Sequence, residues 1–178
     1  MKETKPIRLI AFDVDGTLTP GTLIFGPEGE AYKTFFAKDG LAMSLAHRMG
    51  FVTGLITGRQ SSIVTMRQKE LHMDFAAMGI SDKVQAMETV LSKYGLTWEE
   101  AAYMGDDWND LALMSKVAVS GAPSDGALEV RAAAHFVSDF PGGGGAARQF
   151  IEWIFRREGR WQEALSLFQT GGHRPVSQ

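Results

Sequence analysis

The chain contains no cysteine among its 178 residues. This excludes disulfide bridges, thiolate zinc sites and a cysteine nucleophile, so any metal must be held by oxygen or imidazole. Long apolar runs are also missing: no stretch could cross a bilayer, and the opening residues Met1 to Pro6 lack the apolar core of a signal peptide. We therefore expect a cytoplasmic protein without a membrane partner.

An excess of positive charge is absent as well. The formal net charge is -3, the isoelectric point is about 5.8, and charges of both signs are mixed along the chain. Nucleic acid is therefore not an expected partner. At this length, a hydrophobic fraction of 44% suffices for one substantial core but not for two. We predict a single domain over residues 1–168, followed by a flexible tail over residues 169–178.

Short apolar runs alternate with amphipathic stretches along most of the chain. The apolar runs predict strands at residues 51–56, 74–78, 101–104, 117–119 and 135–137. The amphipathic stretches predict helices at residues 61–71, 82–94, 109–116, 124–134 and 146–157. This alternation is typical of a doubly wound, mostly parallel α/β sheet. Glycines and prolines between residues 19 and 36 predict a β-hairpin that projects from the sheet.

Two carboxylates stand one residue apart after the first apolar run. Asp13 and Asp15 follow Leu9 to Phe12, and Gly16 then begins a turn. Neighbouring side chains of an extended strand point to opposite faces, so the two aspartates share a face at the strand's carboxyl end. Ligands of open α/β sheets bind at that edge. Carboxylates this close repel each other unless a cation lies between them or one is protonated.

Further polar groups stand where other predicted elements begin or end. They are Thr57 and Gly58 after one strand, Lys83 at the start of a helix, and Asp106 with Asp110 after another strand. Because the carboxyl ends of parallel strands meet at one edge of a sheet, we expect these groups to converge on the first carboxylate pair.

The charges of these groups suit phosphoryl chemistry. Asp13, Asp15 and Asp106 supply the hard oxygen ligands that Mg²⁺ combines with water and phosphate oxygens. A carboxylate beside that cation can attack phosphorus. Asp13 would then form an aspartyl-phosphate, and Asp15 would protonate the leaving alcohol and later activate water. Lys83 and the metal would offset the phosphoryl charge, while the Thr57 hydroxyl would hold its oxygens.

Taken one at a time, several of these features have simpler explanations. An isolated Asp-x-Asp-Gly is usually a turn or a cap, and Thr57 with Gly58 could merely end a strand. Arg59 and Arg67 lie two turns apart and could be solvated on one helix face. Lys83 differs, because the start of a helix disfavours a cation.

The motifs in this order resemble those of the haloacid dehalogenase-like phosphatase superfamily. Asp13-Val14-Asp15-Gly16-Thr17 is similar to its first motif, Thr57-Gly58 to its second, Lys83 to its third, and Gly105-Asp106-Asp107 with Asp110 to its fourth. The resemblance implies that Asp13 is the nucleophile and Asp15 the acid/base. It also implies that Mg²⁺ is held by Asp13, the Asp15 backbone carbonyl and Asp106, with Asp110 orienting the metal shell.

The spacing between motifs leaves no room for a separate cap domain. In this the chain resembles a capless subfamily, the 3-deoxy-D-manno-octulosonate-8-phosphate phosphatases, which are tetramers. The resemblance implies a homotetramer in which the hairpin and tail of one subunit cover a neighbouring active site. The similar segments are Gly26-Pro27-Glu28-Gly29-Glu30, Lys38-Asp39-Gly40, Ile56-Thr57-Gly58-Arg59, Arg67, Asp82-Lys83, residues 102–107 and residues 142–146.

The same resemblance implies a sugar acid phosphate as substrate. A ligand with both a carboxylate and a phosphate needs more than one cationic group, and arginine offers a fork suited to carboxylate. Related phosphatases of nine-carbon 2-keto acids tend to have Glu at the position of Arg59, so Arg59 favours the eight-carbon substrate. The implied substrate-binding residues are Asp15, Lys38, Asp39, Gly40, Thr57, Gly58, Arg59, Arg67 and Lys83.

Two alternatives remain open at this stage. The first is a phosphatase of nine-carbon keto acid phosphates or of a broader set of sugar phosphates. It stays open because Lys38, Ser44 and Gly144 stand where the subfamily commonly has arginine. The second is a non-catalytic regulatory module that keeps the fold, against which the four intact motifs argue.

Overall fold

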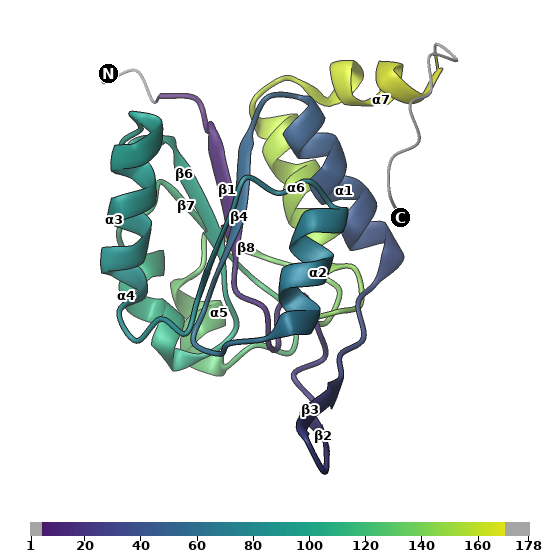
Figure 1. Cartoon of the computed structure of the whole chain (residues 1–178). Helices are drawn as coiled ribbons and strands as arrows, with labels where there is room; N and C mark the ends of the chain where they lie inside the picture. Colours follow the sequence, from purple (N-terminus) through teal and green to yellow (C-terminus); the bar gives the residue numbers. More distant parts are fainter. Residues whose placement is uncertain (1–4, 170–178) are drawn as a thin grey trace.

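The structure is a computed structural model that describes residues 5–169. It contains a six-stranded sheet in the order β5-β4-β1-β6-β7-β8, and every neighbouring pair is parallel (Figure 1). The predicted doubly wound α/β fold is therefore confirmed. The strands are β1 (Leu9–Phe12), β4 (Val52–Thr57), β5 (Phe75–Met78), β6 (Ala101–Met104), β7 (Val119–Ala122) and β8 (Phe136–Val137).

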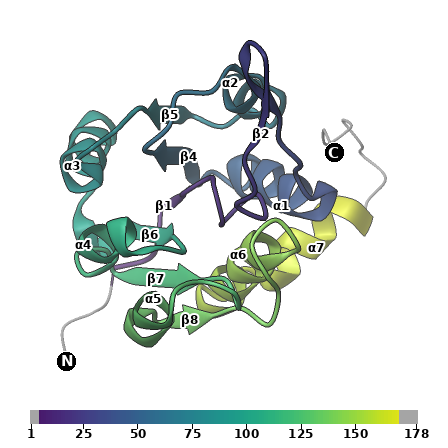
Figure 2. The same ribbon diagram turned by 90° about the horizontal axis from the view of Figure 1, so that it is seen from below.

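Helices cover both faces of this sheet (Figures 1 and 2). One face carries α1 (Ala37–Arg48), α2 (Ser62–Glu70), α6 (Ala146–Arg157) and α7 (Trp161–Gln169). The other face carries α3 (Lys83–Tyr94), α4 (Leu111–Met114) and α5 (Leu128–Ala133). Two short 3-10 helices, η1 (Trp98–Glu100) and η2 (Trp108–Asp110), flank β6. None of the helices within residues 5–169 has the length and apolar character of a membrane span.

Strand β1 lies in the middle of the sheet and divides the core in two. Its side chains alternate, so that Ile10 and Phe12 face α1 and α6, whereas Leu9 and Ala11 face α3 and α4. All four residues are buried, as expected for a central strand of a covered parallel sheet. The loop that follows β1 therefore starts from a rigid support.

The predicted hairpin is present between β1 and α1. It consists of β2 (Ile24–Gly26) and β3 (Gly29–Tyr32), which pair antiparallel and form no part of the main sheet. Figure 1 shows it projecting from the end of the molecule at which β1 and β4 finish. No separate cap domain stands among residues 5–169, in agreement with the prediction.

Helices α1 and α7 have no counterpart in the sequence prediction. Helix α1 packs against both the sheet and α6, so buried residues such as Ser44, Leu45 and Ala46 lie around much of its circumference. A helix buried in this way lacks the one-sided apolar pattern that marks a surface helix, and Gly40 weakens its helix propensity further.

Helix α7 ends at Gln169, and residues 170–178 lie outside the described part. The predicted domain limits and flexible tail stay predictions.

Two boundaries differ for local reasons. Strand β7 runs from Val119 to Ala122 instead of 117–119, because it includes Ser120 and Gly121, which no apolar pattern marks. Gly121 is needed there, since a Cβ atom at this position would lie 2.8 Å from the Phe150 ring. Helix α5 begins only at Leu128, after a turn closed by the Gly126 N–H to the Pro123 carbonyl at 3.2 Å.

Candidate active site

The carboxyl ends of three adjacent strands carry the expected polar residues. Asp13 follows β1, Thr57 ends β4, and Asp106 comes two residues after β6. These strands lie side by side in the order β4-β1-β6. The Asp13 N–H donates to the Met104 carbonyl at 2.9 Å, which fixes the start of the loop after β1 against the end of β6. The structure thus brings these three residues to one edge, as the sequence predicts.

Lys83 lies buried between two carboxylates. Its Nζ is 2.9 Å from Asp13 Oδ1 and 2.7 Å from Asp110 Oδ1. Burial lowers the pKa of Lys83, but the charges of Asp13 and Asp110 raise it more, and the net shift is upward. These carboxylates thereby offset the unfavourable placement of a cation in the first turn of α3. Lys83 is therefore a permanent positive charge beside Asp13.

Asp110 organises the loop after β6. Its Oδ1 accepts hydrogen bonds from Lys83 and from the Tyr103 hydroxyl, the latter at 2.7 Å. Its Oδ2 accepts from the backbone N–H groups of Asp106 at 2.9 Å and Asp107 at 3.1 Å. With four donors on one buried carboxylate, Asp110 holds the loop that presents Asp106.

The acidic cluster fits a divalent cation. Asp13, Asp106 and Asp110 each offer an oxygen atom within 4.8 Å of the others. Burial, followed by the charge of Asp13, raises the pKa of Asp106 to about 7, and burial likewise raises the pKa of Asp13. A cation between these carboxylates would stabilise their charged forms. Since Asp110 is already saturated with donors, Asp13 and Asp106 are the better ligands, with Asp110 supporting them.

Thr17 and Gly16 set the position of Asp106 from the other side. The Thr17 hydroxyl donates to Asp106 Oδ1 at 2.8 Å, which leaves Oδ2 for a further ligand. Gly16 has a φ of +93°, and a Cβ atom there would overlap Asp106 Oδ2. Only glycine therefore allows the loop after β1 to approach this carboxylate so closely.

The glycine run before α6 packs onto the same loop. The Gly143 N–H donates to the Thr17 carbonyl at 3.0 Å, and a Cβ atom at Gly142 would overlap the Gly16 carbonyl oxygen. The run is therefore not a linker. It supports the loop that carries Asp13 and Asp15.

Asp15 lies between a cation at the end of the hairpin and a cation that follows β4. Lys33 forms an ion pair with Asp15 Oδ1 and lies 2.8 Å from Glu30 Oε1. On the other side, Arg59 Nε is 3.8 Å from Asp15 Oδ2, and its guanidinium lies over the Phe25 ring at 5.7 Å. Lys33 and Glu30 are absent from the residues predicted from sequence. The sequence signal that could have identified Lys33 is the alternation of side chains along the hairpin. Tyr32 points outward, so the next residue, Lys33, points inward.

The segment after β4 lies close to the start of the loop after β5. Thr57 is buried, and its carbonyl accepts the Ile80 N–H at 3.1 Å, while Gly58 lies opposite the Ile80 carbonyl. This pairing leads the chain from β5 toward α3 and hence to Lys83. The segment that carries Thr57 and Gly58 thus lies next to the loop that leads to Lys83.

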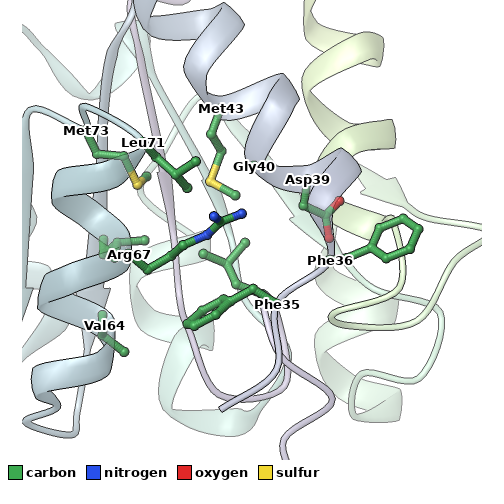
Figure 3. A pocket seen from close by; sticks show the side chains of 11 residues that line it. Phe35, Phe36, Asp39, Gly40, Met43, Val64, Arg67, Leu71 and Met73 are labelled. Carbon is green, nitrogen blue, oxygen red and sulfur yellow. The ribbon is translucent and has the colours of Figure 1, made fainter. Parts of the chain in front are cut away.

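Arg67, Asp39 and Gly40 line a narrow pocket between α1 and α2 (Figure 3). The Arg67 guanidinium points toward Gly40, lies 5.7 Å from the Phe35 ring centre and pairs with Glu70 at 2.8 Å. A Cβ atom at Gly40 would overlap Arg67 Nη2, so this glycine makes room for the guanidinium. Substrate binding by these three residues stays a prediction.

Asp39 itself connects α1 to α6. It is only 1% exposed, and its Oδ1 accepts the Arg148 backbone N–H at 2.7 Å in the first turn of α6. The neighbouring Lys38 is exposed and lies over the Phe36 ring at 6.0 Å. Of the predicted segment 38–40, Lys38 is thus the residue with an accessible charge, whereas Asp39 caps a helix.

The cap predicts a pH-dependent stability. Burial raises the pKa of Asp39 to about 6, although backbone N–H groups of Arg148 and Gly145 favour its ionised form. The folded protein therefore holds this proton more tightly than the unfolded chain, and stability is lost as the pH rises from about 4 through 6. We expect Asp39→Asn to gain about 3 kcal/mol relative to the wild type between pH 4 and pH 8, measured by urea unfolding.

Asp139→Asn provides the matched control, because Asp139 is an exposed carboxylate. Its stability relative to the wild type should stay nearly constant over this range. A constant difference for Asp39→Asn as well would show that burial does not shift the Asp39 pKa.

Comparison with known proteins decides the family. Residues 51–150 match the family model described as haloacid dehalogenase-like hydrolase, which is more than half of the chain. The chain belongs to the haloacid dehalogenase-like hydrolases. The matched residues include the second, third and fourth motifs. The first motif precedes them in the sequence, and the structure places its Asp13 beside Lys83 of the third.

Individual members of this hydrolase family are similar over nearly the whole chain. The 3-deoxy-D-manno-octulosonate 8-phosphate phosphatase KdsC of Escherichia coli strain K12 is 34% identical over 158 residues, which cover 89% of this chain and 84% of that protein. The crystal structure of the Moraxella catarrhalis 3-deoxy-D-manno-octulosonate 8-phosphate phosphatase has a TM-score of 0.87 and 32% identity, covering 92% of this chain and 94% of that one. It was determined in complex with magnesium, phosphate and KDO.

A third relative is a probable YrbI family phosphatase from Pseudomonas syringae. Its crystal structure has a TM-score of 0.90 and 37% identity, and the match covers 94% of this chain and 96% of that one. The predicted membership of the superfamily is confirmed, and so is the predicted hydrolase class.

Proposed function

We propose that this hydrolase removes the phosphate of 3-deoxy-D-manno-octulosonate 8-phosphate in a Mg²⁺-dependent reaction. The observation that carries the proposal is the cluster of buried Asp13, Asp110 and Lys83 with the half-buried Asp106, in a chain that is 34% identical to a KdsC phosphatase. The presence of magnesium, phosphate and KDO in the Moraxella relative supports both the metal and the product.

The metal site proposed here uses this chain's own oxygen atoms. Asp13 and Asp106 supply carboxylate ligands, Asp15 contributes its backbone carbonyl, and Asp110 orients the loop. When bound, Mg²⁺ offsets the negative charge of the carboxylates and of the phosphoryl group.

The reaction uses Asp13 as the nucleophile. Its free carboxylate oxygen attacks phosphorus and the ester P–O bond breaks, while Asp15 gives a proton to the leaving sugar oxygen. In the second step Asp15 takes a proton from water, the water oxygen attacks phosphorus, and the bond to Asp13 breaks to release phosphate. Lys83 keeps a positive charge beside Asp13 throughout, and the Thr57 hydroxyl binds a phosphoryl oxygen.

Cationic side chains around the site suit a sugar acid. Arg59 is partly exposed beside Asp15, and Lys38 is exposed at the start of α1. We assign these two residues and Arg67, with Asp39, Gly40 and Gly58, to the region that binds the sugar acid. Charge complementarity to a carboxylate supports this assignment.

A panel of phosphate esters tests the substrate. We expect 3-deoxy-D-manno-octulosonate 8-phosphate to give the highest kcat/KM in the presence of Mg²⁺. A preference above tenfold for a nine-carbon keto acid phosphate or another sugar phosphate would replace the named substrate by the broader class. Absence of turnover on every ester would favour the regulatory alternative. Removal of Mg²⁺ with EDTA should abolish turnover, and its return should restore it.

We further propose a homotetramer in which the hairpin and the tail of one subunit cover a neighbouring site. The hairpin exposes the side chains of Leu23, Ile24 and Phe25, the last of them to 61%, and a second subunit would bury them. The tail residues 170–178 lie outside the described residues. Analytical ultracentrifugation of the full chain measures the subunit number. The predicted cytoplasmic location stays a prediction.

A further inference from the structure

We infer that Lys33 is a positioning residue that fixes the Asp15 carboxylate in the orientation needed for proton transfer to the leaving sugar oxygen and from the attacking water. This inference rests on the proposed function, in which Asp15 is the acid/base. It extends that function because it gives the projecting hairpin a role in the active site of its own chain.

Lys33 is held on the inward side of the hairpin. It directly follows β3, in which Tyr32 is 70% exposed, and the Lys33 side chain is only 2% exposed. Its ammonium group contacts Asp15 Oδ1 and lies 2.8 Å from Glu30 Oε1. An ammonium group has three donors, so one lysine can bridge both carboxylates. Burial of a lysine is costly unless it is paired in this way.

The second carboxylate anchors this arrangement to helix α2. Glu30 Oε2 accepts a hydrogen bond from the Ser61 hydroxyl, and Ser61 is the N-cap of α2, where its Oγ accepts the Val64 N–H at 3.2 Å. Figure 2 shows the hairpin beside α2. The chain of contacts from Ser61 through Glu30 to Lys33 and Asp15 therefore joins α2 to the loop after β1.

The two oxygens of Asp15 are left in unequal surroundings. Oδ1 contacts the ammonium group of Lys33, whereas Oδ2 has Arg59 Nε at 3.8 Å, which is beyond hydrogen-bond distance. Oδ2 is thus the oxygen that remains available for the leaving group and for water. Proton transfer needs a heavy-atom separation of about 2.6–3.2 Å, so a freely rotating carboxylate would be within reach only part of the time.

The test compares two substrates with leaving groups of different basicity. An alkyl phosphate such as 3-deoxy-D-manno-octulosonate 8-phosphate needs a proton on its leaving oxygen, whereas p-nitrophenyl phosphate releases a stable anion. For Lys33→Met we expect the rate of phosphoenzyme formation from the alkyl phosphate, measured by rapid acid quench, to fall by about 100-fold, the order of a general-acid contribution. The concentration of that ester that gives half the maximal rate of this step should stay nearly unchanged, and the rate of phosphoenzyme formation from p-nitrophenyl phosphate should fall by less than about threefold. Hydrolysis of the phosphoenzyme, in which Asp15 takes a proton from water, should slow equally for both esters.

Two further variants sharpen the result. Glu30→Gln keeps Lys33 but weakens its anchor. Its loss of rate should be smaller than that of Lys33→Met, and again larger for the alkyl ester than for p-nitrophenyl phosphate. It also decides the question if Lys33→Met fails to fold. Lys69→Met is the matched control, because Lys69 is exposed on α2, and it should leave both activities unchanged.

Several results would overturn the inference. Equal losses in the rate of phosphoenzyme formation from both substrates would mean that Lys33 only maintains the fold. A rise in KM with an unchanged kcat would make it a substrate-binding group, and unchanged kinetics would remove any role. Failure of the wild type to hydrolyse the alkyl phosphate would instead refute the proposed function.

Discussion

Replacement of Asp13 by Asn is expected to lower kcat by at least about 10⁴-fold while the protein stays folded. An amide has the shape of the carboxylate but cannot form the covalent phosphoryl bond at a useful rate. Folding should be retained because burial raises the pKa of Asp13, which means that the folded protein disfavours its charge. Steady-state kinetics with excess Mg²⁺ and circular dichroism measure the two effects.

The control for this variant is Asp139→Asn, which changes an exposed carboxylate in the same way. It should retain wild-type turnover. If Asp13→Asn keeps more than a tenth of the wild-type kcat, another group must be the nucleophile.

Replacement of Lys83 by Met should have the largest effect on stability. It removes the cation that lies 2.9 Å from Asp13 and 2.7 Å from Asp110, and both carboxylates are buried. An uncompensated buried charge costs about 3–5 kcal/mol, so the free energy of unfolding in EDTA should fall by about that amount. Turnover should also be lost, because no positive side chain then remains beside the attacking oxygen.

Mg²⁺ separates the electrostatic cause from a packing defect. A divalent cation between Asp13 and Asp106 would offset part of the missing charge, so added Mg²⁺ should stabilise Lys83→Met more than the wild type. Urea unfolding in EDTA and in Mg²⁺ gives both values. Lys69→Met should lose little stability in either condition. An unchanged unfolding free energy for Lys83→Met would contradict the assigned pairing.

The parts of the site that could be predicted from sequence are those fixed by the sheet. Asp13, Thr57 and Asp106 follow buried strands, and parallel strands place their carboxyl ends at one edge regardless of the details of packing. Lys83 could be found because a cation at the start of a helix needs a partner. For these residues, the order of motifs along the chain is sufficient to predict that they meet at one site.

The environment of Asp15 could not be predicted in the same way. Lys33 reaches it only because Glu30 holds the hairpin against α2, and no apolar pattern encodes that contact. The sequence prediction treated the hairpin as a cover for a neighbouring subunit. The structure shows that its base also contacts the active site of its own chain.

The region around α1 was missed for a different reason. The helix is buried against both the sheet and α6, so its apolar residues are not confined to one stripe. The role of Asp39 as a cap on α6 depends on two helices that are more than 100 residues apart. Local sequence carries no information on such a contact.

The most direct test of the account is an acid quench of the enzyme during turnover of 3-deoxy-D-manno-octulosonate 8-phosphate labelled with ³²P. We predict that label is bound to the protein within a single turnover, that peptide mapping locates it at Asp13, and that excess unlabelled substrate chases it into free phosphate. Label on another residue, or hydrolysis without any protein-bound label, would contradict Asp13 as the nucleophile of this phosphatase.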